Sequence, residues 1–441
     1  MRIRALLVAA ILVREAFSFW TGHPFDFEIW VRTGYTVGHG TSPYLPMPYV
    51  PGLSFASDFG GPGLDPLIGY LPFWPVLLGG IYKLYVLIGS PSRFVYYFLL
   101  KQPIIACDVL LGYYLYRYVE RRGSNEASFV LKVWLFSPLN IVFSAIWGMW
   151  DAIPMLFVVF ALMARPGAYR GAWSGLATFA KSIPIIFAIP LSWGPNKVRN
   201  LGLALGIPVV ASLAIVWLAG WQVTSFQIAV QSTLARGGSS LSLWETVYYL
   251  NSIGLISNSV LNSFVSTGYV WILAVAIATV LAYRWFGFDT ERGVIQSMLL
   301  LTLTFLLLRG VVNEQYALYF YALALIDVAL WSPERRRLVL VGIAAVLMFN
   351  ATNVLLFIRY VAPIVPQALT IEANLVAKIG PERNALLFLE AVVFWVVELY
   401  YFYSLVKERN VRTEDALLGA QLRLFSPNPL GEDARRRASD K

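Results

Sequence analysis

The sequence predicts an all-α protein that crosses a membrane many times, and three features of the chain lead to this prediction. Of its 441 residues, 58% are hydrophobic and only 13% are charged, whereas about a quarter of a soluble domain is charged. Apolar stretches of roughly 20 residues, the length that crosses a bilayer as a helix, recur along the chain. Its 15 Trp, 24 Tyr and 28 Phe residues could form aromatic belts at membrane interfaces.

Charge and cysteine content exclude several other classes of protein. The basic residues behind the net charge of +9 lie between apolar segments and near the C-terminus, which is typical of basic loops that orient spans rather than of nucleic-acid binding. The single cysteine, Cys107, allows neither an intramolecular disulfide nor a cysteine-based metal cluster. His23 and His39 are too few for a histidine-rich site, so carboxylates would have to hold any metal. We predict no cofactor, and the need for a divalent metal stays open.

Candidate spans follow from the apolar stretches. The first, residues 3–20, resembles a signal peptide but lacks a clear cleavage site, so we expect an uncleaved span. Windows 67–89, 94–118 and 171–193 are less simple, because each contains Pro and Lys. With the other windows, roughly 10–13 spans are predicted. The other windows are 128–146, 148–164, 201–219, 268–286, 293–309, 315–331, 337–357 and 385–406.

Basic loops predict which ends of the spans face the cytoplasm. Arginines at the N-terminus place it inside and therefore place residues 21–66 outside. The basic stretch 117–127 also belongs inside, so one of the windows 67–89 and 94–118 cannot cross fully. We expect 94–118, which contains Lys, Pro and Asp, to be the broken or re-entrant element.

The same argument applies to window 171–193, which has basic residues on both sides. We expect it to be re-entrant, with Lys181 and Pro184 lining a cavity, because non-helical backbone at membrane depth needs protein or water around it. The remaining spans then alternate regularly, and both termini are cytoplasmic. The predicted outer loops are 21–66, 220–267, 309–316 and 358–384.

This organisation corresponds to one transmembrane domain, residues 1–410, followed by a basic cytoplasmic tail, residues 411–441, whose composition favours disorder. In the first outer loop, the segment from Glu28 to Gly38 is typical of a short amphipathic helix lying along the interface. The Gly- and Pro-rich run that follows, which contains Tyr44, indicates a rigid loop.

Carboxylates of the outer loops are the first candidates for chemistry. Asp26 and Glu28 flank Phe27, and a carboxylate at the water boundary can accept a proton from a hydroxyl group. The alternative is that Asp26 caps the following helix, and local spacing alone favours the cap. Asp151 offers the same choice, between a helix cap before Pro154 and a second carboxylate that faces the same cavity.

Two further stretches place charged residues beside apolar spans. Lys181 lies inside an apolar segment, where a charge is a candidate for function, although snorkelling to an interface is the alternative. Arg309 begins a short outer loop and could bind a phosphate, because guanidinium matches phosphate geometry. The polar residues after it could bind sugar hydroxyls, or could pair with Arg309 in a loop that satisfies itself. These polar residues are Asn313, Glu314 and Gln315.

Considered together, these motifs resemble the GT-C superfamily of membrane glycosyltransferases, which use polyprenyl- or dolichyl-phosphate sugars. The resemblance is strongest to the mannosyltransferases that add the first mannose in glycosylphosphatidylinositol (GPI) synthesis and to their prokaryotic relatives. The family has a D-x-D-type acidic pair in its first luminal loop, and here Asp26-Phe27-Glu28 stands at that place, with Glu as the second acid.

Other family motifs follow in order along the chain up to residue 330. The segment 42–44 matches a Ser-Pro-Tyr of the first loop, and 179–184 followed by Ile189-Pro190 resembles F-K-x-x-P and L-P. The segment 311–316 resembles V-x-x-Q-Y. The segment 147–151 resembles the W-G-Q-x-D of the prokaryotic relatives, with Met where Gln is usual.

The resemblance implies an inverting mannosyl transfer in which Asp26 is the general base and Glu28 the second acid of the catalytic pair. It implies a polyprenyl or dolichyl phosphate sugar donor and a lipid-linked or glycolipid acceptor, and it implies that Lys181 and Arg309 stabilise the leaving phosphate. The residues expected to bind substrate are Tyr44, Asp151, Lys181, Arg309, Asn313, Glu314, Gln315 and Tyr316.

Two other functions remain open at this point. A transporter or flippase of lipid-linked sugars would show paired broken helices in related halves, and the sequence has no matching halves. A non-catalytic subunit of a glycosylation complex would tolerate Asp26→Asn. For the enzyme, we expect a site on the outer face of a prokaryotic cell membrane, or on the luminal face of the endoplasmic reticulum if the protein is eukaryotic.

Overall fold

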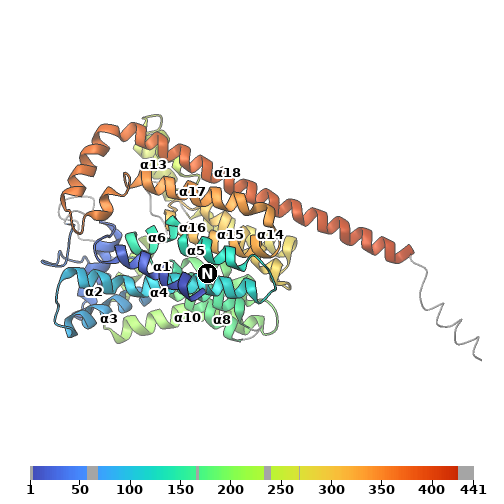
Figure 1. Ribbon diagram of the computed structural model, residues 1–441, viewed down its shortest axis with the longest axis horizontal. Helices are drawn as coiled ribbons and strands as arrows, with labels where there is room; N and C mark the ends of the chain where they lie inside the picture. Colours follow the sequence, from blue (N-terminus) through green and yellow to red (C-terminus); the bar gives the residue numbers. More distant parts are fainter. Residues whose placement is uncertain (1–2, 57–67, 165–167, 233–239, 268, 426–441) are drawn as a thin grey trace, which may run out of the picture.

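The computed structural model describes residues 3–56, 68–164, 168–232, 240–267 and 269–425. Every regular element in these ranges is a helix, and the helices pack into one bundle (Figure 1). Among the described residues, four helices are long and apolar enough to cross a membrane, or up to six if each bent pair is one span. The predicted all-α membrane protein is confirmed, but this part of the chain has fewer full-length spanning helices than the roughly 10–13 expected. The difference arises because several apolar windows are divided into short helices.

The N-terminal part of the bundle corrects one prediction about the spans. Helix α4 is a continuous helix of 28 residues that passes the span criteria, so the window 94–118 is neither broken nor re-entrant. Helix α3 instead is too short to cross, because its 15 residues extend only about 22 Å. It packs against α2, where a Cβ added at Gly34 would lie 2.9 Å from the carbonyl oxygen of Leu78. The bounds are α1 Ile3–Ser18, α2 Asp26–Gly38, α3 Phe73–Leu87 and α4 Arg93–Glu120.

Polar residues do not break α4 because other helices satisfy them. Asp108 accepts a hydrogen bond from the Nε of Arg14 in α1 at 2.7 Å and one from the indole of Trp134 at 3.0 Å. Lys101 donates to backbone carbonyl groups of two neighbouring segments. The Lys, Pro and Asp that suggested an irregular element are therefore compatible with an unbroken helix.

The next part of the chain contains the predicted span 128–146, which is bent by 47°. The bend lies at Ser137, and Pro138 then begins a short helix, since proline suits the first helical position. A π-helical turn follows and ends at Gly148, whose φ of +89° is left-handed. The bounds are α5 Ala127–Phe136, α6 Pro138–Ile141, the π-helix Val142–Trp147 and α7 Ala152–Met163.

The window 171–193 does not form one continuous helix but folds back on itself, which is the arrangement expected of a re-entrant segment. Helix α8 ends at Ala180, and the 3-10 turn and short helix that follow pack against it. The amide of Asn200 in α10 donates to the carbonyl of Ser192 at 3.4 Å, and a Cβ added at Gly171 would lie 2.3 Å from the backbone of Asn200. The bounds are α8 Ala168–Ala180, the 3-10 turn Ile183–Phe187, α9 Ala188–Ser192 and α10 Lys197–Leu218.

The second half of the bundle alternates long helices with short elements. Helix α18 has a break at Ile379, next to Pro381, and its last part extends beyond the bundle (Figure 1). The helix is drawn to Phe425, and residues 426–441 lie outside the described residues. The bounds are α11 Val223–Ser232, α12 Glu245–Ser252, α13 Asn258–Ser266, α14 Val270–Phe286, α15 Glu291–Leu308, α16 Ala317–Leu330, α17 Arg336–Asn353 and α18 Gln367–Phe425, with 3-10 turns at Glu314–Tyr316, Pro333–Arg335 and Ile358–Val361.

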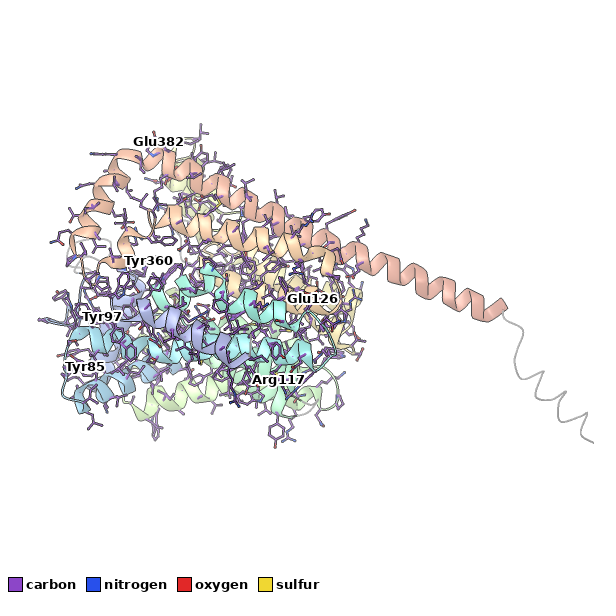
Figure 2. All side chains as sticks on the ribbon, viewed as in Figure 1. Tyr85, Tyr97, Arg117, Glu126, Tyr360 and Glu382 are labelled. Carbon is purple, nitrogen blue, oxygen red and sulfur yellow. The ribbon has the colours of Figure 1, made fainter. Side chains whose placement is uncertain are left out.

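The two ends of the bundle gather different loops. Figure 2 shows Tyr97 and Tyr360 at one end of the bundle, which we call the Tyr360 end. Arg117 and Glu126 lie at the opposite end, which we call the Arg117 end. Loops that were predicted to be basic and cytoplasmic meet at the Arg117 end through ion pairs between distant segments. These pairs are Arg122–Glu291, Arg336–Glu126 and Arg292–Glu408. The segments predicted to be outer loops meet at the Tyr360 end, where they form the candidate site.

Candidate active site

Asp26 is the first residue of α2 and is almost buried at the Tyr360 end. Its Oδ2 accepts a hydrogen bond of 2.9 Å from the indole N–H of Trp147, the last residue of the π-helix. A neutral donor orients the carboxylate without neutralising its charge. A carboxylate held in this way is a candidate for a general base.

His23 supplies the helix cap that local spacing had assigned to Asp26. Its Nδ1 accepts hydrogen bonds from the backbone amides of Phe25 and Asp26, both at 3.2 Å. Because Nδ1 is an acceptor, it cannot also donate to the carboxylate of Asp26, 3.5 Å away. The imidazole ring stacks on Trp147 at 4.8 Å between ring centroids. The cap interpretation of Asp26 is thus wrong, and its carboxylate is directed elsewhere.

Lys101 joins the two backbone segments that hold Asp26 and its indole donor. Its buried Nζ donates to the carbonyl oxygens of Thr21 and Ala145, each at 2.7 Å. Thr21 lies just before the His23 cap, and Ala145 lies in the π-helix that ends at Trp147. From the sequence, Lys101 was expected only to interrupt a span, because its carbonyl partners lie far away in the chain.

Glu28 has surroundings unlike those of Asp26. Its Oε1 pairs with the Nε of Arg32 at 2.8 Å, and its Oε2 accepts from the amide of Phe55 at 2.9 Å. Arg32 in turn donates to the carbonyl of Ala56 at 2.7 Å. Burial raises the pKa of Glu28, and the hydrogen bonds and the charge of Arg32 act in the opposite direction. Glu28 fastens the first loop to α2.

The Asp26–Glu28 pair does not fit a shared divalent ion. A metal at Glu28 would have to displace the guanidinium of Arg32 and the amide of Phe55, which occupy both carboxylate oxygens. In the described part of the chain, no group of three or more His, Cys, Asp or Glu side chains is arranged to hold a metal ion.

Asp151 and Lys181 form a buried ion pair at the tip of the re-entrant segment. The ammonium lies 2.8 and 2.7 Å from the two carboxylate oxygens, and both side chains are almost completely buried. The side chain of Asp151 makes no cap hydrogen bond to α7, and Lys181 does not snorkel to the surface. The indole of Trp150 donates to the carbonyl of Ala180 at 3.2 Å and fixes the same tip.

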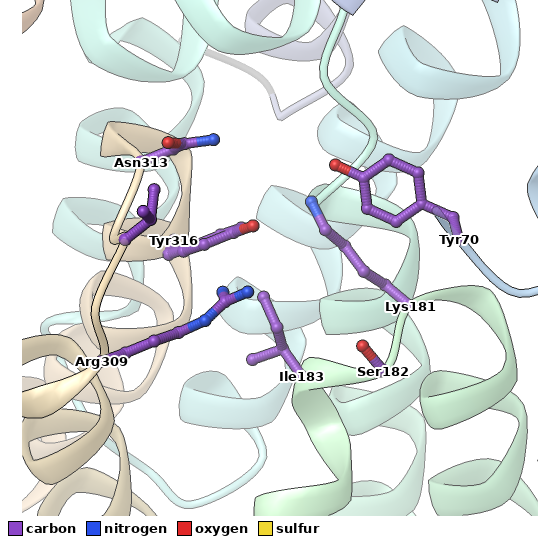
Figure 3. A pocket seen from close by; sticks show the side chains of 8 residues that line it. Tyr70, Lys181, Ser182, Ile183, Arg309, Asn313 and Tyr316 are labelled. Carbon is purple, nitrogen blue, oxygen red and sulfur yellow. The ribbon is translucent and has the colours of Figure 1, made fainter. Parts of the chain in front are cut away.

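A narrow polar pocket opens beside this pair (Figure 3). From one side, Arg309 and Tyr316 point into it, and from the other side Lys181 and Tyr70 do so, with Asn313 at its edge. The cavity measures about 30 Å³. The Nζ of Lys181 lies 5.0 Å from the ring centroid of Tyr316, and the guanidinium of Arg309 lies at the same distance from that ring.

The polar pocket continues into an apolar cavity of about 420 Å³. The two share Ser182, Ile183 and Arg309, so that the arginine lies at their junction. The walls of the larger cavity come from the re-entrant segment, α14 and α15, and they are mostly Ile, Trp, Val and Phe. The arrangement suits a ligand that has an anionic group attached to a hydrocarbon chain.

Glu314 and Gln315 lie in the loop between α15 and α16. Glu314 accepts from the side-chain amides of Asn353 at 2.9 Å and Asn350 at 3.4 Å. Burial raises the pKa of Glu314, and the nearby charge of Asp26 raises it further, although the hydrogen bonds oppose this. Gln315 is fully buried, and within the described residues neither its amide oxygen nor its amide nitrogen has a hydrogen-bond partner. Buried side-chain amides are normally hydrogen-bonded, so the amide of Gln315 is a candidate for binding a polar group of a ligand.

A segment that sequence analysis did not single out braces this loop. Leu241 donates through its amide to the carbonyl of Val312 at 3.0 Å, and the hydroxyl of Ser240 accepts from the amide of Val312 at 2.6 Å. The carboxylate of Glu245 accepts from the amide of Ser240 at 2.7 Å. Burial raises the pKa of Glu245 to about 7.

The structure brings some predicted residues together and separates others. Lys181, Arg309, Asn313 and Tyr316 line the polar pocket, with Asp151 paired to Lys181. Tyr44 does not line the pocket; its hydroxyl donates to the carbonyl of Tyr70, which does, and its ring packs on Phe226 of α11. Pro184 does not line this pocket or the apolar cavity beside it. Asp58 and Asp65, at the end of the first loop, lie outside the described residues.

Comparison with known proteins finds a distant similarity over part of the chain. No model of a protein family matches the chain. An alignment of 173 positions, which covers 36% of the chain, shows 24% identity to GPI mannosyltransferase 1 of Eremothecium gossypii. The matched segment covers 43% of that relative, so the similarity spans less than half of its length. The chain is thus distantly similar to a mannosyltransferase over about a third of its residues.

Proposed function

We propose that this protein is a membrane glycosyltransferase that moves a mannosyl residue from a polyprenyl or dolichyl phosphate donor to a lipid-linked glycan or glycolipid acceptor, with inversion. The observation that carries the proposal is a nearly buried carboxylate, Asp26, oriented by a neutral donor at the same end as a cationic pocket that opens into an apolar cavity. The distant similarity to a GPI mannosyltransferase supports the choice of sugar.

The donor follows from the two connected cavities. The isoprenoid chain occupies the apolar cavity between the re-entrant segment, α14 and α15, and its phosphate lies at the junction beside Arg309. Arg309 and Lys181 both line the polar pocket at this junction, and the planar guanidinium of Arg309 matches the geometry of a phosphate. The buried amide of Gln315, without a partner in the described residues, supports a role in binding a polar substrate group.

The reaction uses the carboxylate and the cations in sequence. Asp26 accepts the proton of an acceptor hydroxyl as its oxygen forms a bond to C1 of the mannosyl group. The bond between C1 and the phosphate oxygen breaks on the opposite side, and the lipid phosphate leaves with the electron pair. Arg309 and Lys181 stabilise the charge of the leaving group, and the two binding regions hold the reactants in line.

A transfer assay in membranes tests the proposal. Wild-type protein, labelled polyprenyl-phosphate mannose and a lipid extract should yield labelled glycolipid with the inverted anomeric configuration, and Asp26→Asn should yield almost none. Asp289→Asn, an exposed acid in the turn between α14 and α15, is the matched control and should leave the product unchanged. Absence of product with the wild type, or unchanged product with Asp26→Asn, would overturn the assignment. A flippase would instead move the labelled donor across vesicles without forming a new glycoside.

A further inference from the structure

We propose a second lipid site, independent of the proposed transfer reaction, in the groove between α17 and α18 at the Arg117 end. The ligand that fits is a glycerophospholipid with a phosphoethanolamine headgroup. Its acyl chains lie against Val396 and its neighbours, its phosphate faces Lys407, and its ammonium group faces Glu334.

The groove consists of two cavities that share Leu338 and Tyr400. The first, of about 350 Å³, is lined by Leu, Val and Tyr side chains alone. The second, of about 410 Å³, is lined in addition by Ser404 and by charged residues. The surface therefore changes from apolar to charged along one line, which is the order of chains and headgroup in a phospholipid.

The dimensions of the groove match one leaflet of a membrane. From Val392 to Lys407, α18 advances by about 22 Å. Half of a bilayer that measures roughly 40–45 Å across its headgroups is nearly the same length. The side chains of Val396, Tyr400 and Tyr403 are more than half exposed, so this face of α18 is open to lipid.

The groove is remote from the Asp26 region. Helix α16 begins directly after Tyr316, which lines the polar pocket, and leads to Arg335 at the other end of the bundle. The ion pair between Arg336 and Glu126 confirms that this turn lies at the Arg117 end. A ligand in the groove would thus occupy the leaflet opposite to that of the proposed mannosyl donor.

The charges in the headgroup cavity favour a zwitterion over an anion. Arg335 is already engaged by Asp327 at 2.8 Å and by Glu408 at 2.9 Å. Lys407 and Glu334 line the same cavity, and neither has an ion-pair partner within the described residues. One cation and one anion match the phosphate and the ammonium of phosphoethanolamine. A primary ammonium also donates hydrogen bonds to Glu334, which a choline group cannot do.

Native mass spectrometry of the full chain in detergent tests this site. Dioleoyl-phosphatidylethanolamine, -phosphatidylcholine and -phosphatidylglycerol are added separately, and the lipid that stays bound is measured together with the melting temperature. We expect phosphatidylethanolamine to be retained about tenfold better than the other two and to raise the melting temperature. Equal retention of the three lipids, or preference for phosphatidylglycerol, would overturn the proposal.

Variants separate the headgroup from the acyl chains. Lys407→Met combined with Glu334→Gln should reduce retention of phosphatidylethanolamine about tenfold. The matched control, Lys378→Met with Glu382→Gln, removes one cation and one anion from the other part of α18 and should change nothing. Val396→Trp should fill the apolar cavity and abolish retention. If Val396→Trp instead dissociates a dimer while lipid retention stays the same, the groove is an interface between copies of the chain and the proposal is wrong.

Discussion

Asp26 and Glu28 are two acids of one motif, yet their surroundings are opposite. Asp26 has a neutral indole donor and lies at a site whose other components come from distant loops. Glu28 is fully buried, and Arg32 and a backbone amide occupy both of its oxygens. The reason is geometric: side chains two positions apart on an α-helix point about 200° away from each other around the helix axis. Two acids spaced in this way act together only where the chain is not helical.

The comparison separates a chemical role from a structural one. In the proposed enzyme, Asp26 accepts a proton and can be lost without loosening the fold. Glu28 holds the first loop on α2, and its loss would affect the fold before it affects the chemistry. The following predictions test this difference, from the largest expected effect to the smallest.

Replacing Asp26 by Asn should reduce kcat for mannosyl transfer by about 10²–10⁴-fold, because the amide cannot accept the proton. The melting temperature should stay close to that of the wild type, since the amide oxygen still accepts from Trp147. Transfer assays and thermal unfolding of the same preparation measure both quantities. A large fall in melting temperature would show that Asp26, like Glu28, mainly holds the fold.

Replacing Glu28 by Gln should lower the free energy of unfolding by about 3–5 kcal/mol, because Arg32 is left buried without its counter-charge. The folded fraction should keep most of the wild-type kcat. Chemical unfolding in detergent gives the first quantity, and activity per folded protein gives the second. The double variant Glu28→Gln, Arg32→Met should recover part of the stability. If Glu28→Gln is as inactive as Asp26→Asn while fully stable, both acids take part in the chemistry.

Replacing Lys101 by Met should reduce kcat by about 10–100-fold without changing the KM for the donor, since a small displacement of Asp26 and Trp147 misplaces the base. The loss should change the rate at all pH values rather than shift the pH–rate profile. Lys132→Met, on an exposed face of the neighbouring α5, is the matched control. A rise in KM with kcat unchanged would place Lys101 in donor binding instead.

The stability of the protein should depend on pH through Glu245, whose carboxylate holds the segment that packs on the loop after Arg309. Its pKa is raised to about 7 from an ordinary value near 4.5, so its contribution to stability is complete below 4.5 and is lost as the pH rises through 7. The melting temperature of the wild type should therefore fall by a few degrees between pH 6 and pH 8. Glu245→Gln should remove most of this fall. An equal fall in both proteins would assign the effect to other groups.

Much of the fold could be predicted because apolar stretches and basic loops can be recognised from residues that are neighbours in the sequence. The apolar windows identified the all-α membrane protein, and basic residues on both sides of 171–193 identified the re-entrant segment. The same reasoning failed for α4, because the pairing of Arg14 with Asp108 joins residues far apart in the chain. A charged residue in an apolar window does not break a helix when a residue from another helix pairs with it, as Arg14 does with Asp108.

The candidate site shows the same limit. Asp26, Lys181 and Arg309 became candidates through their residue type and position, and their roles stay predictions. The pairing of Lys181 with Asp151 was not predicted, because Lys181 was expected to stabilise a phosphate, and Asp151 was expected either to cap a helix or to face the cavity as a second carboxylate. Lys101 and Glu245 were missed, since they act on backbone groups, which carry no signal in the sequence.

Gly148 has a consequence for how this protein tolerates mutation. Its left-handed backbone ends the π-helix, and a Cβ at this position would lie 2.7 Å from the ring of Phe27. Its carbonyl oxygen also accepts the indole N–H of Trp30. A saturation screen scored by growth or product should therefore find position 148 as intolerant as position 26, although glycine carries no reactive group. The fitness map of this protein would include a residue whose whole contribution is the absence of a side chain.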